Sequence, residues 1–221
     1  MSNGFPFIDI IFFACVALFI AFRLRNVLGR RTGHERRPEA PPVGGGGRDN
    51  VVTLPGRDDS AEAAFSHIDD AELRAGLTDI RRHDPDFDLE EFLMGARQAF
   101  EMIVDGFARG DTGMLRPLLS DDVYAGFAEA IEQRRQAGET LETEVVAIKQ
   151  ADAVEARMEG TRAVLAVRFV SDQVNVTRDA GGDVVDGDPD QLAEITDVWT
   201  FGRDTASRDP NWELVSTAAA E

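Results

Sequence analysis

Cysteine is almost absent from this chain of 221 residues, with Cys15 as the single example. One cysteine forms no intramolecular disulfide and no CxxC pair, which excludes disulfide frameworks, dithiol redox motifs and cysteine-rich zinc sites. Histidine is also scarce, and the three residues His34, His67 and His83 have no partner at metal-ligand spacing. We therefore expect no cofactor and no metal, and the chain is compatible with a reducing compartment.

Basic residues are also few relative to acidic ones. The chain has 23 basic residues against 41 acidic ones, a formal net charge of −18, and Lys149 is its only lysine. Residues 1–50 hold seven arginines and four acids, a net charge of +3, so the rest of the chain carries −21. A body this acidic repels phosphate backbones, and no nucleic acid partner is expected. The acidity indicates a solvated, solubilising surface, with a site for a basic partner as the alternative.

Long apolar runs are missing except at the beginning of the chain, where residues 4–22 read GFPFIDIIFFACVALFIAF. As a helix, the run from Phe5 to Phe22 spans about 27 Å, just enough for a hydrocarbon core of roughly 30 Å. Its basic residues follow the run, whereas a secretory signal peptide carries them before it. The sequence therefore predicts an uncleaved single-pass anchor over residues 1–31, with a buried core helix as the alternative.

The arginines after this run predict its orientation and a contact with lipid. Arg23, Arg25, Arg30 and Arg31 are expected to stay in the cytoplasm and to bind anionic lipid headgroups, while the short N-terminus crosses the membrane. Asp9 lies about one turn into the run, where it either reaches the outer interface or contacts a partner helix. We therefore expect a bacterial inner-membrane protein with its acidic domain on the cytoplasmic side.

Proline, glycine and charge dominate residues 32–60, which predicts a flexible linker. The glycine run 44–47 has neither a strand before it nor Lys-Ser/Thr after it, so it does not indicate a phosphate-binding loop. Residues 61–83 follow with apolar side chains at helical spacing, and they predict an amphipathic helix that packs on the domain or on the membrane.

The apolar pattern of residues 84–221 is typical of a packed α+β domain. Asp86 or Asp88 is expected to cap a helix that ends at Gly110, a short helical turn follows near 114–119, and Ser120 caps a third helix that ends at Gly138. Beyond Gly138 the apolar period changes from 3.6 to 2, which predicts strands at 141–148, 153–158, 163–176, 192–201 and 212–217. Helices followed by antiparallel strands indicate helices packed on one face of a sheet.

Candidate site residues are mostly aromatic. The set that recurs at helix or strand spacing forms either plain core or the lining of a ligand pocket, and it comprises Phe92, Phe100, Phe107, Phe127, Phe169, Trp199 and Trp212. Asp197 is the one carboxyl that we name as a candidate general acid or base, and the alternative is an outward strand residue or one bonded to Arg168 or Arg203. No nucleophile elbow accompanies any serine, so a non-enzymatic protein is expected.

Several phrases resemble, in order, the C-terminal domain of subunit 44 of the mitochondrial inner-membrane translocase and its bacterial relatives. The matching text is DPDFD at 84–88, FLMGA at 92–96, AFEMI at 99–103, Gly110-Asp111, LLS at 118–120, GDPD at 187–190, VWTF at 198–201 and DPNWEL at 209–214. The likeness covers about residues 75–218. The anchor followed by Leu-Gly-Arg-Arg-Thr-Gly resembles the bacterial members.

The resemblance implies a cystatin-like or nuclear-transport-factor-two-like cone, in which helices and a curved antiparallel sheet enclose an apolar pocket. It also implies a membrane-associated adaptor that binds a protein partner, anionic lipid or both, in protein translocation or membrane-complex assembly. The chain has an anchor and a linker in place of the long basic, coiled N-terminal region of mitochondrial members. The alternative function is a small pocket enzyme or apolar-ligand binder of the same superfamily.

Overall fold

The computed structural model describes residues 57–219. The predicted anchor at 1–31, Asp9, the headgroup arginines Arg23, Arg25, Arg30 and Arg31, and all but the end of the predicted linker lie outside the described residues. Within residues 57–219, no helix is both long enough and apolar enough to span a bilayer.

The described part of the chain is an α+β domain in which the helices precede the strands, as predicted. The helices are α2 (Arg57–Ala64), α3 (Ala71–His83), α4 (Leu89–Arg109), α5 (Thr112–Leu115) and α6 (Asp121–Ala137). The strands are β1 (Thr140–Glu159), β2 (Arg162–Arg178), β3 (Val184–Gly187), β4 (Ala193–Asp204) and β5 (Glu213–Ala219).

The amphipathic segment predicted as one helix forms two, α2 and α3. The carboxylate of Asp70 accepts hydrogen bonds from the backbone N–H groups of Glu72 and Leu73, and so starts α3 as a new helix. The preceding helix begins at Arg57 rather than at Ala61. The single-helix prediction was wrong because α2 already ends at Ala64, where the hydroxyl of Ser66 donates to the carbonyl oxygen of Ala63, and non-helical residues separate it from Asp70.

The longest helix, α4, begins and ends at the predicted residues. The carboxylate of Asp88 accepts from the N–H of Glu91 at 2.9 Å, and Gly110 ends the helix with a φ of 69°. Ser120 stands at the start of α6 but makes no side-chain capping bond, and Gly138 ends that helix with a φ of 73°. Both C-terminal glycines occupy the left-handed region, where a side chain is strained.

The sheet is antiparallel, with the strand order β1-β2-β4-β5 and with β3 paired to the far end of β2. β1 is one long strand where two strands were predicted. Its register against β2 shifts between Val145 and Ala147, between Ile148 and Gln150, and between Ala153 and Glu155. Each extra residue interrupts the alternation of side chains, so a continuous strand gives a broken sequence pattern.

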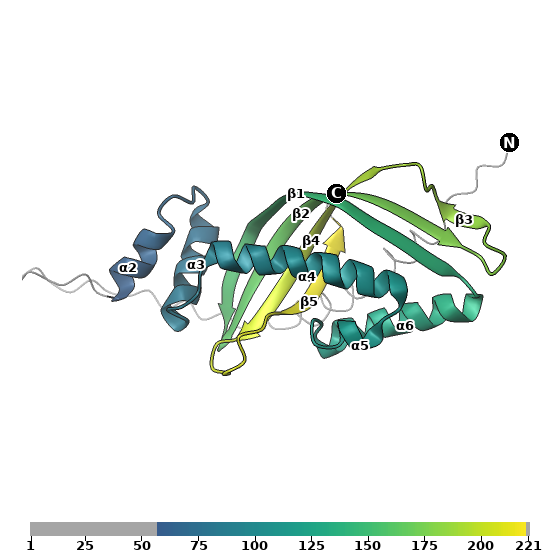
Figure 1. The fold of residues 1–221 in the computed structure, drawn as a ribbon. Helices are drawn as coiled ribbons and strands as arrows, with labels where there is room; N and C mark the ends of the chain where they lie inside the picture. The colour runs from purple at the N-terminus through teal and green to yellow at the C-terminus, as the bar shows by residue number, and fades with distance from the viewer. Residues whose placement is uncertain (1–56, 220–221) are drawn as a thin grey trace, which may run out of the picture.

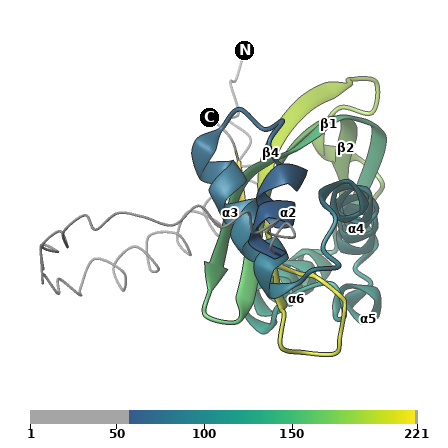
Figure 2. The same ribbon diagram turned by 90° about the vertical axis from the view of Figure 1, so that its left-hand side faces the viewer.

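The helices pack on one face of the curved sheet, with α4 running across it and α3 lying beside it (Figure 1, Figure 2). We call this the inner face. Core residues lie at alternate positions of the two central strands: Ala163, Leu165, Val167 and Phe169 on β2, and Trp199 and Phe201 on β4. At the β1 side, a methyl group on Gly76 of α3 would overlap the carbonyl oxygen of Ala156, so this glycine allows close approach of helix and strand.

Candidate functional site

The predicted pocket aromatics lie in three groups on the inner face. In the first group the ring of Phe100 on α4 stacks on Phe169 with centroids 4.6 Å apart, and it lies equally close to Trp199. Phe100 and Phe169 are fully buried, and Trp199 nearly so. These three rings fill the centre of the core, where α4 crosses β2 and β4.

The second aromatic group lies where the helical N-terminal part meets the sheet. Phe92 packs edge-on against Trp212 with centroids 4.8 Å apart. The ring of Phe87 contacts both of these rings, and it also contacts Phe65, which directly follows α2. Phe65, Phe87 and Phe92 are buried, and Trp212 is partly buried. This cluster fixes the N-terminal helices to the β4–β5 side of the domain.

The third aromatic group joins α4 and α6 at the opposite end. Phe107 and Phe127 pack edge-on at 5.0 Å, and both are partly buried. The guanidinium of Arg134 lies 4.9 Å from the centroid of the Phe107 ring and donates to the carbonyl oxygens of Phe107 and Ala108 at 2.6 and 3.0 Å. Burial lowers the pKa of Arg134. That these partly exposed rings line a ligand pocket stays a prediction.

Asp197 lies on the inner face, not outward as one alternative had it. It pairs with Phe169 across β2 and β4 and shares its side of β4 with Trp199. It is not bonded to Arg168 or Arg203 either, because Arg168 contacts Asp152 and Arg203 contacts Asp84. Burial raises the pKa of the Asp197 carboxyl to about 6. A carboxyl with a pKa raised in this way exchanges its proton closer to neutral pH than a carboxyl on the open surface does.

A row of polar side chains continues the inner face of β2 beyond Phe169. Ser171 and Gln173 are buried, and Asn175 is partly buried. The amide Nε2 of Gln173 donates to the hydroxyl oxygen of Ser171 at 2.8 Å, and Nδ2 of Asn175 donates to Oε1 of Gln173 at 3.5 Å. The inner face is therefore apolar in one half and polar in the other, and Asp197 stands at the boundary.

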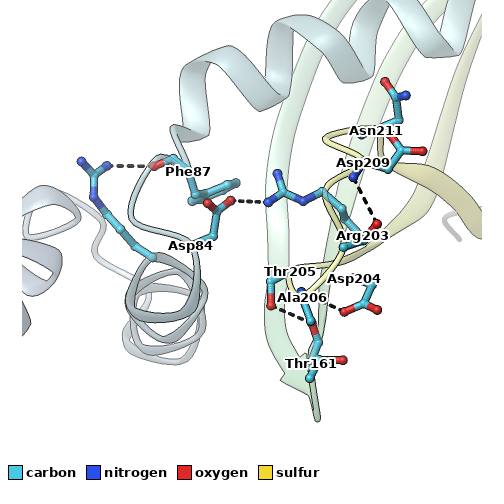
Figure 3. A network of polar contacts seen from close by, with 11 residues as sticks. Asp84, Phe87, Thr161, Arg203, Asp204, Thr205, Ala206, Asp209 and Asn211 are labelled. Carbon is cyan, nitrogen blue, oxygen red and sulfur yellow. Dashed lines mark hydrogen bonds and ion pairs between the residues drawn. The ribbon is translucent and has the colours of Figure 1, made fainter.

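The other charged residue on the inner face of β4 is Arg203, at the end nearest α3 (Figure 3). Its guanidinium donates to Asp84 at 2.7 Å, with only 16% and 14% of the two side chains exposed. It also lies 5.9 Å from the Trp212 ring centroid, and its Nε is buried with no partner within residues 57–219. The pair joins the loop after α3 to the sheet across 119 sequence positions.

Several other acidic and histidine side chains of the described residues have structural partners. Among residues 57–219, no cluster of three or more His, Cys, Asp or Glu side chains is arranged to hold a metal ion. His83 contacts Asp79 of its own helix, at 2.8 Å from the carbonyl oxygen. Asp121 pairs with Arg116, and the carboxylate of Asp88 caps a helix, so these acids have structural partners.

A comparison with protein families matches residues 73–219 to the Tim44-like domain. This match covers most of the described structure and more than half of the chain. The chain belongs to the Tim44-like domain family. The family resemblance in the sequence is therefore confirmed, with a match that begins inside α3 and ends at the last residue of β5.

Two curated relatives of this Tim44-like domain show how far the similarity extends. The mitochondrial import inner membrane translocase subunit TIM44 of Mus musculus is 28% identical over 152 residues, which is 67% of this chain and 34% of the relative. The probable subunit tin-44 of Caenorhabditis elegans is 27% identical over 154 residues, 68% of this chain and 36% of the relative. The chain thus spans about a third of the length of the curated relatives that it matches.

Sequence reasoning missed two parts of the site in this Tim44-like domain. The polar row of Ser171, Gln173 and Asn175 has a signal, because these residues alternate with Asp172 and Val174 in the period of a strand. The spacing of Asp197 from Trp199 and Phe201 also indicates its side of the sheet, because residues two and four apart on a strand share one face. The contact between Arg203 and Asp84 has no local signal, because it joins distant segments.

Proposed function

We propose that this protein is a membrane-tethered adaptor, in which a Tim44-like domain is held at a membrane and binds a protein partner. The observation that carries the proposal is the family match over residues 73–219 in a chain that also contains the apolar run 4–22. The relatives' names describe subunits of a mitochondrial inner-membrane import translocase. We extend from them the general role, protein translocation or the assembly of a membrane complex.

The way α2 and α3 are attached supports an adaptor role. Phe65 is buried against Phe87, Gly76 lies against the backbone of β1, and Asp84 pairs with Arg203. A tether that enters through α2 therefore joins a segment packed on the sheet. A force between the anchor and a bound partner would therefore act on helices that are packed on the sheet, and not on a flexible loop.

The location that we propose follows the arginines. Arg23, Arg25, Arg30 and Arg31 would bind anionic headgroups and keep the acidic domain on the cytoplasmic side of a bacterial inner membrane, with the N-terminus outside. The strongly negative body of the protein opposes direct contact with the same lipid surface. Lipid binding by the arginines and partner binding by the domain are thus assigned to different segments.

A flotation experiment tests the lipid part of this proposal. The full-length protein should float with vesicles that contain anionic lipid, and Gln substitution of Arg23, Arg25, Arg30 and Arg31 should weaken that binding about tenfold or more, at about 1 kcal/mol per arginine. The matched control replaces Arg36, Arg37, Arg48 and Arg57 with Gln. Equal losses in the two variants would show that total charge, and not the juxtamembrane position, drives binding.

The alternative function, a cone-shaped pocket that binds an apolar ligand or acts as a small enzyme, has one observation in its favour. Asp197 is a half-buried carboxyl on the inner face, with the pKa of a weak general acid. Neither His67 nor His83 belongs to the inner-face strands, so no histidine among residues 57–219 shares the sheet face of Asp197. We therefore propose binding and not catalysis for this side of the domain.

A further inference from the structure

Seven large apolar side chains are exposed among residues 57–219, and most of them have a local explanation. Val146 and Val154 lie where the register of β1 against β2 shifts, so each is the extra residue of a bulge. Val184 and Val185 belong to β3, a short strand that pairs only with the end of β2, and Leu192 lies in the loop before β4. The two that remain both lie on α4, a helix of the packed core.

The outer side of α4 carries these two residues, Met94 and Met102, with 60% and 41% of their surface exposed. Gln98 lies midway between them and is also exposed, so the three follow one another at intervals of four along one side of the helix. We call these three residues the methionine stripe. No described helix or strand lies over this side of α4 (Figure 1, Figure 2). Methionine side chains are flexible and adapt to a partner surface, so the stripe has the character of a docking surface.

Acidic side chains border the methionine stripe and determine the charge of a segment that fits it. The acids of α4 are Glu90, Glu91, Glu101 and Asp105. Asp105 pairs with Arg109, whereas the three glutamates make no ion pair within residues 57–219. With Arg97 and Arg109 as its basic residues, α4 has a formal net charge of −2. The surface therefore fits a segment that combines apolar side chains with positive charge.

The chain itself contains a segment of this chemistry at residues 23–31, which read RLRNVLGRR. The segment has four arginines and no acid, a formal net charge of +4. In a helix, Leu24, Val27 and Leu28 would share one side, because they are spaced by three and four residues, and arginines would flank them. Its charge is opposite to that of α4, and its aliphatic side matches the methionine stripe in character.

The length of the chain between this segment and the domain allows the contact. Residues 32–56 reach up to about 85 Å when extended, and about 25–30 Å as a flexible coil. They lead into α2, whose next residue Phe65 contacts Phe87, and α4 begins two positions after Phe87. Met94 lies between one and two turns into α4. A flexible linker of this length holds the segment near the stripe at an effective concentration on the order of millimolar.

We propose that residues 23–31 dock on the methionine stripe of α4 in the same chain, with their aliphatic side against Met94 and Met102. The four arginines are those that we assign to anionic lipid headgroups, so the docked contact and the lipid contact exclude each other. A membrane rich in anionic lipid favours the released state, and an uncharged one favours the docked state. This goes beyond the adaptor role, because the contact requires neither a partner protein nor lipid.

Disulfide trapping in the full-length protein, purified in an uncharged detergent, measures the docked contact. Cys15→Ser removes the only native cysteine, and Val27→Cys is combined with Gln98→Cys at the centre of the stripe. The matched control combines Val27→Cys with Gln133→Cys, which replaces an exposed glutamine of α6. We expect an intramolecular disulfide to form about tenfold faster at Gln98→Cys than at Gln133→Cys. Mixed micelles that contain anionic lipid should slow the first reaction severalfold.

Charge variants test whether the acids of α4 hold the segment. Glu91→Gln combined with Glu101→Gln should slow trapping at Gln98→Cys severalfold, and high salt should do the same. The control makes the same change at Glu129 and Glu144, which are exposed on α6 and β1, and should leave the rate unchanged. All four positions are exposed, so the thermal midpoints of these variants should equal that of the parent protein, and a change in rate cannot be attributed to unfolding.

An apolar variant tests the methionines themselves. Met94→Gln combined with Met102→Gln keeps the length of both side chains and removes their apolar ends, so trapping at Gln98→Cys should slow severalfold. The detergent sample contains no lipid, so the outcome does not depend on whether the arginines also bind headgroups.

Four results would overturn the proposal. Equal rates at Gln98→Cys and Gln133→Cys would show random encounter of the segment with the domain. A disulfide between two chains, with a yield that rises with protein concentration, would assign the stripe to a second copy. An unchanged rate in both the glutamate and the methionine variants would show that the stripe is not used. A rate that anionic lipid leaves unchanged would refute the competition with the membrane.

Discussion

Two charged residues of opposite sign lie on the inner face of β4, and they differ in whether a partner compensates the charge. Arg203 is buried together with its partner Asp84, so its charge is compensated where it lies. Asp197 is half-buried without a partner among residues 57–219, and burial raises its pKa to about 6. The first arrangement fixes the fold and the second weakens it.

Replacing Asp197 with Asn should stabilise the protein at neutral pH. The folded-state pKa lies above the ordinary value of 3.8, so folding favours the protonated form, and that favourable contribution is lost as the pH rises from about 4 to about 6. Linkage sets the gain of Asp197→Asn at up to about 3 kcal/mol near pH 7.5, and about 1 kcal/mol less near pH 5. Urea unfolding at both pH values measures it, and a pH-independent difference would contradict the assignment.

Replacing Arg203 with Met should destabilise the protein strongly. The substitution keeps the aliphatic stem but leaves Asp84 buried and unpaired, a change that typically costs about 3–5 kcal/mol. The control is Arg168→Met, whose partner Asp152 lies on a surface where 47% and 54% of the two side chains are exposed. An exposed pair contributes about 1 kcal/mol or less. Equal losses in chemical denaturation would refute the special role of Arg203.

Among the elements, α3 is the one whose position depends most on a single small residue. Gly76 lets the helix backbone touch β1 at Ala156, while Leu77 and Ile80 are fully buried beside it. A glycine inside a helix is unfavourable by itself. Its presence here is explained by the close approach and not by helix propensity.

Substitution of Gly76 by Ala should therefore reverse the usual effect of Gly→Ala in a helix. Gly126→Ala in α6, where nothing lies within 4 Å of the added methyl group, should stabilise the protein by about 0.5–1 kcal/mol. Gly76→Ala should destabilise it by about 1–3 kcal/mol, because α3 must move away from β1. Thermal unfolding of the two variants side by side is the measurement. A stabilised Gly76→Ala would mean that α3 is not held where we place it.

The elements could be predicted wherever one local signal dominates. Asp88 and Gly110 mark the two ends of α4, and the change of apolar period after Gly138 marks the start of the sheet. The predictions failed where the local pattern fits more than one arrangement of elements. The apolar spacing of 61–83 continues through the break between Ala64 and Asp70, and the bulges in β1 hide the continuity of that strand.

For the whole molecule, the chain separates positive and negative charge along its length. Residues 1–50 carry +3, while the remainder carries −21. The candidate site was predictable in part: the aromatic spacing identified Phe100, Phe169 and Trp199, which do meet. The sequence left open the side of the sheet on which Asp197 lies, and Asp84 was not expected to reach Arg203 because no short-range pattern encodes such a contact.

Crosslinking of the full-length protein in native membranes tests the adaptor proposal most directly. We expect a discrete protein adduct that purifies with the tagged chain from the membrane fraction. The adduct should be lost when the apolar run is broken by Val16→Arg and Ile20→Arg, and kept in the linker control Val51→Arg and Val52→Arg. An adduct that persists in the broken-anchor variant, or a wild-type protein that salt fully releases from membranes without any adduct, would contradict a membrane-tethered adaptor.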